Sequence, residues 1–103
     1  MKKFVCLIPV FNEAKNLKSL CDEIKLNNVF NIDWYIINNG STDLSPKEFE
    51  KIIKKNINFY NVKTFFIKEN RGYGNGLKVC LMEIIDNYEF CIFRNTENDC
   101  RNC

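Results

Sequence analysis

The sequence has no histidine, only four glycines and two prolines, and no long apolar run. Its longest apolar stretch, residues 4–11, is interrupted by Pro9 and falls far short of the roughly 20 residues that a membrane span needs. Only Lys2 and Lys3 precede this stretch, and no small-residue cleavage site follows it, so we interpret it as a first strand rather than a signal peptide. We therefore expect a cytoplasmic protein without a transmembrane segment.

Charge of one sign is not concentrated anywhere along the chain. The formal net charge is +2, and the lysines are interleaved with acidic residues. Proteins that bind nucleic acid usually carry a basic stripe or patch, because they must neutralise phosphates. We therefore expect no nucleic-acid partner.

The composition indicates one small domain with a packed core. The chain has 103 residues, of which 46% are hydrophobic, and general disorder is not expected. Three of the six cysteines, Cys6, Cys21 and Cys80, lie within apolar patterns, where a free cysteine behaves as a small hydrophobic residue. Because no export signal is present, we expect no disulfide framework.

The apolar pattern predicts strands that alternate with helices. Continuous apolar runs predict strands at residues 4–10, 34–37, 62–67 and 90–93. Helices are expected after Asn12, which can cap the first, after Ser45, which can form a capping box with Glu48 and is followed by Pro46, and from about Gly74. Their inner faces should comprise Ala14, Leu17, Leu20, Cys21 and Ile24 in the first helix, Phe49, Ile52 and Ile53 in the second, and Leu77, Cys80, Leu81, Ile84 and Ile85 in the third.

This alternation is typical of the α/β class. It predicts right-handed crossovers and a Rossmann-like parallel sheet of about four strands, with three helices on its faces. We assign residues 1–93 to this one domain. Residues 94–103 are polar and without period, and we interpret them as a tail.

Polar residues and glycines follow the first three predicted strands, at the sheet edge where open parallel sheets bind ligands. Asn12 and Glu13 follow the first strand, residues 38–43 close the second, and residues 70–76 follow the third. Ser41 and Asp43 offer a hydroxyl and a carboxylate to a ribose or base. The glycines of residues 72–76 let a ligand approach the start of a helix, where free amides favour an anion such as a diphosphate, and Arg71 adds a positive charge.

Each of these signals also has an ordinary structural interpretation. Asn39-Gly40 is a common turn, Asn12 is a common helix cap, and Arg71 can simply be solvated. The glycines do not match the dinucleotide-binding fingerprint. What favours a ligand site is that three such loops are expected on one rim of one sheet.

Three segments resemble successive motifs of the family-2 glycosyltransferases, which have the GT-A fold. They are residues 9–13 (Pro-Val-Phe-Asn-Glu), residues 38–43 (Asn-Asn-Gly-Ser-Thr-Asp) and residues 69–76 (Glu-Asn-Arg-Gly-Tyr-Gly-Asn-Gly). The resemblance runs from about Phe4 to Leu81. It implies the nucleotide-binding half of a GT-A domain and transfer of a sugar from a nucleotide-diphospho-sugar to an acceptor hydroxyl.

The resemblance also implies roles for individual residues. Pro9, Phe11 and Glu13 would line the nucleoside pocket, and Asn12, Ser41 and Asp43 would belong to the same donor site. Asn38 and Asn39 would stand where the family commonly has acidic residues that hold the base, and Arg71 and Gly74 would lie near the base and diphosphate. Asn38 departs from the usual aspartate, so we expect an altered base preference.

The family's D-x-D motif, which holds Mg²⁺ or Mn²⁺ against the diphosphate, is not present after the fourth predicted strand. Glu97 and Asp99 are the candidate metal ligands in its place, and the alternative is an ordinary polar tail. The family's acceptor half and general base are also expected beyond this point. We therefore expect a truncated form that binds donor without catalysis, or a second polypeptide that supplies the rest, and an exposed sheet edge that lowers solubility.

Three other hypotheses remain open from the sequence. The first is a non-catalytic nucleotide-binding module that uses the same rim. The second is a small zinc site at Cys91, Cys100 and Cys103, which would need Cys80 or a carboxylate as a fourth ligand because histidine is missing. The third is that the tail results from a shifted reading frame.

Overall fold

The computed structural model describes residues 4–29 and 31–94. Its elements, in chain order, are β1 (Phe4–Val10), the short 3-10 helix η1 (Ala14–Asn16), α1 (Leu17–Asn27), β2 (Ile32–Asn39), α2 (Pro46–Asn56), β3 (Val62–Ile67), α3 (Tyr73–Ile84), a second 3-10 helix η2 (Ile85–Asn87), and β4 (Phe90–Phe93). The predicted alternation of strands and helices is confirmed. Only β2 is clearly longer than expected, because Ile32, Asp33, Asn38 and Asn39 also pair with neighbouring strands.

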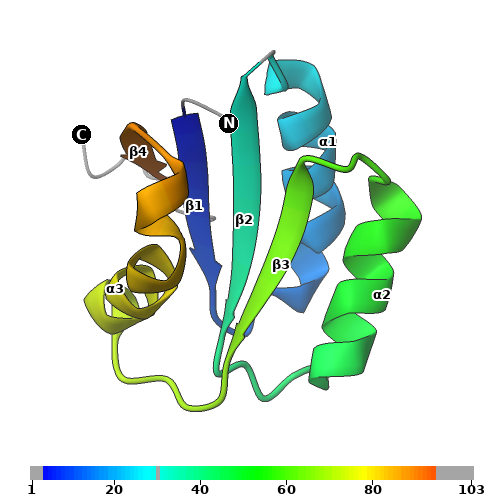
Figure 1. Cartoon of the computed structure of the whole chain (residues 1–103). Coiled ribbons are helices and arrows are strands. Elements are labelled where there is room, and N and C mark those ends of the chain that lie inside the picture. Colours follow the sequence, from blue (N-terminus) through cyan, green and yellow to red (C-terminus); the bar gives the residue numbers. More distant parts are fainter. Residues whose placement is uncertain (1–3, 30, 95–103) are drawn as a thin grey trace, which may run out of the picture.

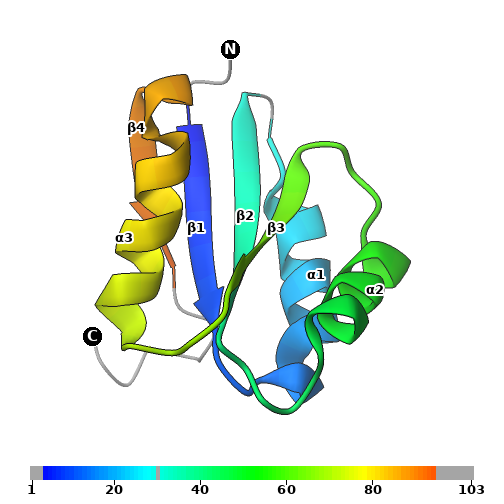
Figure 2. The same ribbon diagram turned by 60° about the horizontal axis from the view of Figure 1, so that its bottom comes forward.

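The four strands form one parallel sheet in the order β3-β2-β1-β4. Helices α1 and α2 pack on one face, and α3 packs on the other, so the sheet lies between two helical layers (Figures 1 and 2). The predicted Rossmann-like α/β fold is confirmed. The strand order reverses at β1, because β2 and β3 lie on one side of it and β4 on the other.

Alternate residues of β1 and β2 supply two separate cores. Cys6, Ile8 and Ile36 face α1 and α2, whereas Leu7 and Ile37 face α3. All five side chains are at most 3% exposed. Coverage on both faces explains why these strands are continuous apolar runs in the sequence, and burial of each large aliphatic side chain contributes about 1.5–3 kcal/mol.

The cysteines predicted to be core residues are buried. Cys6 and Cys21 belong to the core beneath α1 and α2, and Cys80 belongs to the core beneath α3. Burial raises the pKa of the Cys6 and Cys21 thiols to about 11 and that of Cys80 to about 12. These thiols therefore remain protonated at neutral pH and act as small apolar groups.

Helix α2 begins with the predicted capping box. Ser45 Oγ accepts a hydrogen bond from Glu48 N at 3.1 Å, and Glu48 Oε1 accepts one from Ser45 N at 2.9 Å. Pro46 follows at the first helical position, where its missing N–H has no partner to lose. The bond from Ser45 lowers the pKa of the Glu48 carboxyl.

Two local predictions are wrong. Asn12 does not cap the first helix: its side chain makes no cap hydrogen bond there, and its backbone has a left-handed φ of 50°. Ile85 is not on the inner face of α3 but 48% exposed, because the chain tightens into η2 at this residue and turns the side chain outward.

A polar cluster that the sequence did not predict lies at the amino ends of the strands. Asp33 is 4% exposed, and its Oδ2 accepts hydrogen bonds from Lys63 Nζ at 3.0 Å and from the Tyr88 hydroxyl. Burial, reinforced by the bond to Asp33, raises the pKa of Tyr88. The cluster ties β2, β3 and the segment before β4 together at the end of the sheet opposite the polar loops. Within the two described ranges, no helix has the length and apolar character needed to cross a membrane.

Candidate functional site

Three loops leave the carboxyl ends of β1, β2 and β3 at the same edge of the sheet, which we call the rim (Figure 2). Loop 1 is residues 11–13, loop 2 is residues 40–45 and loop 3 is residues 68–72. Parallel pairing brings their starting points together, since Val10 lies beside Asn38 and Asn39 lies beside Ile67. The predicted gathering of the three loops is therefore present.

Asn12 fastens loop 1 to loop 2. Its Oδ1 accepts hydrogen bonds from Thr42 N at 2.7 Å and Asp43 N at 3.2 Å. In return, Ser41 Oγ accepts from Asn12 N, and Asp43 Oδ2 accepts from Ala14 N, both at 3.0 Å. The left-handed backbone that Asn tolerates well turns the carboxamide toward loop 2. Asn12, Ser41 and Asp43 thus hold the shape of the rim.

Gly40 lets loop 2 touch loop 3. Its φ is 71°, and a Cβ at this position would lie 2.3 Å from Asn70 N and 2.8 Å from Glu69 C. Both atoms are backbone and have little freedom to move away. Loop 3 is held in turn by Asn70 Oδ1, which accepts from Gly72 N at 2.7 Å. Only glycine at position 40 permits this contact without strain.

Asn38 and Asn39 are adjacent in β2 and point to opposite faces of the sheet. Asn38 Oδ1 accepts from Ser41 N at 3.0 Å, and Asn39 Nδ2 donates to Gly72 O at 3.3 Å. Both residues are 2% exposed. A carboxylate at position 39 would have no donor for Gly72 O, and at either position it would be a buried charge.

Beneath α3, Asn39 occupies space that a glycine leaves open. A Cβ on Gly76 would lie 2.8 Å from Cγ, Nδ2 and Oδ1 of Asn39. Asn39 Oδ1 and Asn38 Nδ2 have no hydrogen-bond partner among the described residues. The two carboxamides are thus each half satisfied, and both serve first to set loops 2 and 3 in place.

The groups that the rim exposes to a ligand come mainly from loops 1 and 3. Phe11 is 45% exposed, and the side chain of Arg71 is 70% exposed. Arg71 Nε donates to Glu69 Oε1 at 2.9 Å, an exposed pair that leaves the rest of the guanidinium accessible. Helix α3 starts here, after Gly72 at φ 103°, and a Cβ on Gly74 would meet no atom within 4 Å. A ligand can therefore approach the backbone of the first helical turn closely.

Two other predicted residues are placed differently. Pro9 is buried within β1 and has no N–H, and the pairing of β1 with β4 covers only Phe4 to Leu7. Glu13 is half-buried, and its Oε1 accepts from Asn16 Nδ2 at 2.6 Å. Pro9 therefore lies in the part of β1 that no longer pairs with β4, and Glu13 stabilises the start of η1.

The predicted metal ligands Glu97 and Asp99 lie outside the described residues, as do Cys100 and Cys103 of the zinc hypothesis. Among residues 4–29 and 31–94, no three histidine, cysteine, aspartate or glutamate side chains come together as a metal site. Cys91 is a free thiol.

Sequence reasoning did not select Thr42, Gly72 and Gly76 as site residues. Each contributes through its backbone: Thr42 N binds Asn12, Gly72 binds both Asn39 and Asn70, and Gly76 makes room for Asn39. The close spacing of the glycines was the only sequence signal for the last two. Nothing in the local pattern shows which partner each one meets.

Comparison with known proteins agrees with this arrangement. The family model described as glycosyl transferase family 2 matches residues 5–92, which include all three loops. No curated protein matches the chain.

Proposed function

This chain belongs to glycosyl transferase family 2, and we propose that its rim binds a nucleotide-diphospho-sugar donor. The observation that carries the proposal is the mutual fastening of three loops, which presents an aromatic ring, a guanidinium and a helix start at one edge of the sheet. A site that is already shaped loses little conformational entropy when the ligand arrives.

The nucleoside end of the donor would lie on loop 1. Phe11 is exposed next to Asn12, whose three hydrogen bonds to residues 42 and 43 limit the movement of this loop. A planar base gains from contact with an aromatic face, by about 1–3 kcal/mol in nucleic-acid complexes. Thr42 and Asp43 are both exposed on the neighbouring loop and can reach a ribose or base edge.

The diphosphate would lie on loop 3 and the start of α3. The first amides of a helix have no intrahelical acceptor, and the helix dipole favours an anion by about 0.3–1 kcal/mol. Arg71 adds a charge-assisted contact. Gly74 matters here because open space surrounds it, so phosphate oxygens can come close to the backbone.

The described residues do not fit a divalent-cation site. Of the rim carboxylates, Asp43 and Glu13 already accept hydrogen bonds from residues of η1, and Glu69 is paired with Arg71. Glu97 and Asp99 remain the predicted ligands for Mg²⁺ or Mn²⁺. Sugar transfer to an acceptor hydroxyl also needs a general base, and no rim residue has that role in this proposal. We assign donor binding to the rim, and the base and acceptor surface to a part outside it or to a second polypeptide.

A cytoplasmic location belongs to the same proposal. Cys6, Cys21, Cys80 and Cys91 are all free thiols. Reduced cysteines are typical of the cytosol, where thiols are kept reduced.

Isothermal titration with UDP-glucose and GDP-mannose, each with Mn²⁺, tests the proposal directly. Binding of one donor with sugar transfer to an added acceptor supports a transferase. Binding without transfer supports a non-catalytic nucleotide-binding module. If neither donor nor the free nucleoside diphosphates bind, the proposal is wrong.

Two variants locate the ligand on the rim. Arg71→Gln removes a charge-assisted contact and should raise Kd about ten- to hundredfold. Phe11→Ala should weaken the binding of the nucleoside and of the complete donor by the same factor, because the ring would contact only the base. Lys55→Gln, an exposed charge change on α2, is the matched control and should leave Kd unchanged.

A further inference from the structure

Strand β3 forms an open edge of the sheet (Figure 1). In the described part of the chain it pairs with β2 alone. Trp34 N donates to Asn61 O, so the backbone groups of Lys63 and Phe65 also turn toward β2. Those of Thr64 and Phe66 therefore point outward. Such an edge can accept a further strand.

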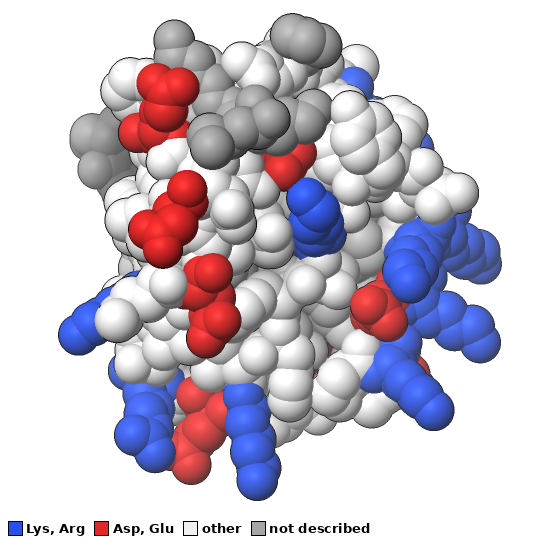
Figure 3. Space-filling view, viewed as in Figure 1, with Lys and Arg blue, Asp and Glu red and all other residues white. Residues whose placement is uncertain are grey.

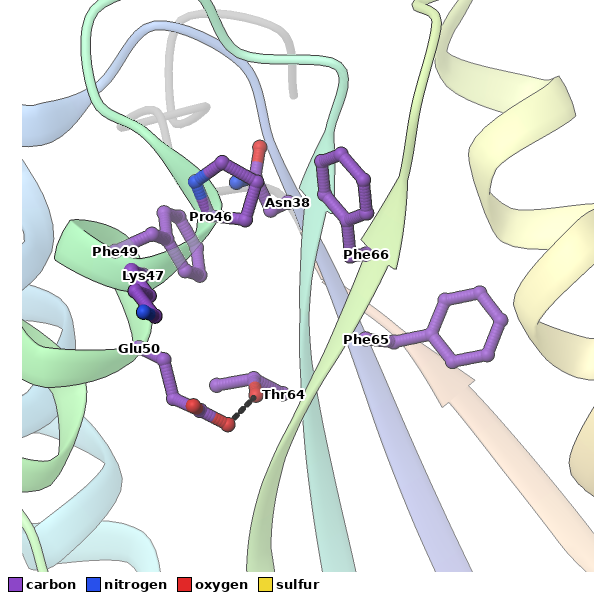
Figure 4. Close-up of a pocket in the computed structure, with 8 residues that line it drawn as sticks. All are labelled: Asn38, Pro46, Lys47, Phe49, Glu50, Thr64, Phe65 and Phe66. Carbon is purple, nitrogen blue, oxygen red and sulfur yellow. Dashed lines mark hydrogen bonds between the residues drawn. The ribbon is translucent and has the colours of Figure 1, made fainter.

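The same two residues line a groove between β3 and α2. Because side chains and backbone groups alternate together along a strand, Thr64 and Phe66 project their side chains toward α2. One hollow of about 240 Å³ is lined by residues that include Asn38, Pro46, Phe49, Glu50, Thr64 and Phe66. Figure 4 shows Phe66 on the groove side of β3 with Pro46, Phe49 and Asn38, whereas Phe65 points away from them.

A second hollow of about 300 Å³ continues the groove toward the amino end of β3. It shares Glu50 and Thr64 with the first, and its apolar lining includes Ile53, Ile57 and Val62. The groove thus follows the whole length of the strand edge. Its apolar floor at both ends suits side chains that project alternately from an extended peptide.

The margins of the groove are basic. Lys47 and Lys54 line it on the α2 side, against a single acidic residue, Glu50. The ammonium of Lys63 lies on the other face of the sheet, bonded to Asp33. Glu50 is already engaged, because it accepts from Thr64 Oγ1 at 3.3 Å and lies 3.9 Å from Lys54 Nζ. Figure 3 shows that Lys and Arg side chains gather over α2 on this side of the molecule. The surplus of positive charge selects against a basic partner and favours an acidic one.

We propose that the groove between α2 and β3 binds an extended segment of a partner polypeptide whose groove-facing side chains, at every second position, include both apolar and acidic residues. The segment adds as a strand to β3 through the backbone of Thr64 and Phe66. Its groove-facing apolar side chains enter the two hollows, and a groove-facing carboxylate between them lies beside Lys47 and Lys54. The site is separate from the rim, except that the buried Asn38 closes one end of the groove.

Charge also argues against a second copy of this chain as the occupant. A two-fold axis through the β3 edge would place the two α2 helices on the same face, next to each other. Lys47 and Lys54 of one copy would then face the same lysines of the other, which disfavours pairing. Nucleic acid is disfavoured because the lysines flank an apolar strip rather than form a continuous stripe.

Fluorescence anisotropy measures the interaction with a labelled peptide that carries valine, glutamate and phenylalanine at successive groove-facing positions, with threonine at the positions between them. The same peptide with lysine in place of glutamate is the charge control, and binding of the acidic peptide should weaken as salt is added. Amide hydrogen exchange adds a readout that needs no variant. Peptide should slow exchange at Thr64 and Phe66 and leave Lys63 and Phe65 unchanged, because those two amides are already bonded to β2.

Thr64→Pro and Thr64→Val form a matched pair. Both lose the bond to Glu50, but only proline removes the outward N–H, a change that an edge strand tolerates. We expect Thr64→Pro to raise Kd at least about tenfold relative to Thr64→Val. Lys54→Glu should weaken binding of the acidic peptide. Lys78→Glu, an exposed charge change on α3, is the control and should leave binding of this peptide unchanged.

Three results would overturn the proposal. They are equal binding of the acidic and lysine peptides, equal Kd for the two Thr64 variants, and exchange at Thr64 and Phe66 that the peptide does not slow. Self-association in sedimentation that Thr64→Pro abolishes would assign the edge to a second copy instead.

Discussion

Replacement of Gly76 by alanine tests how tightly α3 is seated on the rim. A Cβ at this position would lie 2.8 Å from three atoms of the Asn39 carboxamide, closer than carbon normally approaches. Asn39 is 2% exposed and donates to Gly72 O, so it has no free space to retreat into. Either α3 must lift or the hydrogen bond to loop 3 must break.

Two opposing effects set the magnitude. Alanine is a better helix former than glycine, by about 0.5–1 kcal/mol, and this favours the variant. Overpacking costs about 1–3 kcal/mol, and loss of the bond to Gly72 adds about 0.5–1.5 kcal/mol. We therefore expect Gly76→Ala to lower the free energy of unfolding by about 1–3 kcal/mol.

Urea unfolding followed by circular dichroism measures this change, and Gly74→Ala is the matched control. Gly74 lies in the same helical turn, but a Cβ there would meet nothing within 4 Å. Gly74→Ala should therefore be neutral or slightly stabilising. In an Asn39→Ala background the clashing atoms are gone, so Gly76→Ala should become neutral or stabilising, with a coupling of about 2 kcal/mol between the two sites. A Gly76→Ala protein as stable as wild type, or a cycle without coupling, would refute the packing described for α3.

Three further predictions concern other parts of the fold. Gly40→Ala should lower the free energy of unfolding in urea by at least about 3 kcal/mol, because it combines a left-handed backbone with a backbone contact at 2.3 Å. A smaller effect than that of Gly76→Ala would contradict this. Glu48→Gln should lower stability at neutral pH, and the difference from wild type should vanish on acidification. Glu48 has a lowered pKa in the folded protein, so its contribution to stability is present above the ordinary value of 4.5 and is lost as pH falls through the folded pKa. Cys80, whose pKa is raised to about 12, should react with iodoacetamide at pH 8 far more slowly in folded protein than in urea. Peptide mass spectrometry measures the two rates, and equal rates would show that Cys80 is not buried.

The exposed apolar side chains of β4 concern the solubility that the sequence led us to expect. Phe90, Ile92 and Phe93 are 52%, 45% and 51% exposed, and β4 pairs only with β1 among the described residues. Such an edge favours association in the absence of a cover. Low solubility therefore remains a prediction.

The sequence by itself determined the features that depend on neighbours along the chain. Apolar runs predicted β1 and β3, spacings of three and four predicted the inner faces of α1 and α2, and Ser45 with Glu48 predicted the start of α2. These signals are legible because strand and helix periodicity and capping operate within a few residues. The order of loops along one sheet edge followed from the same alternation.

Only the tertiary structure decided what each loop residue contacts. Asn12 looked like a helix cap but binds the amide of Thr42, 30 residues further on. The neighbours Asn38 and Asn39 fasten different loops, and Gly76 proved to be the space into which Asn39 fits. Such contacts depend on strand register and on the seating of one helix against the sheet. Residues distant in sequence set these distances jointly, so no local pattern records them.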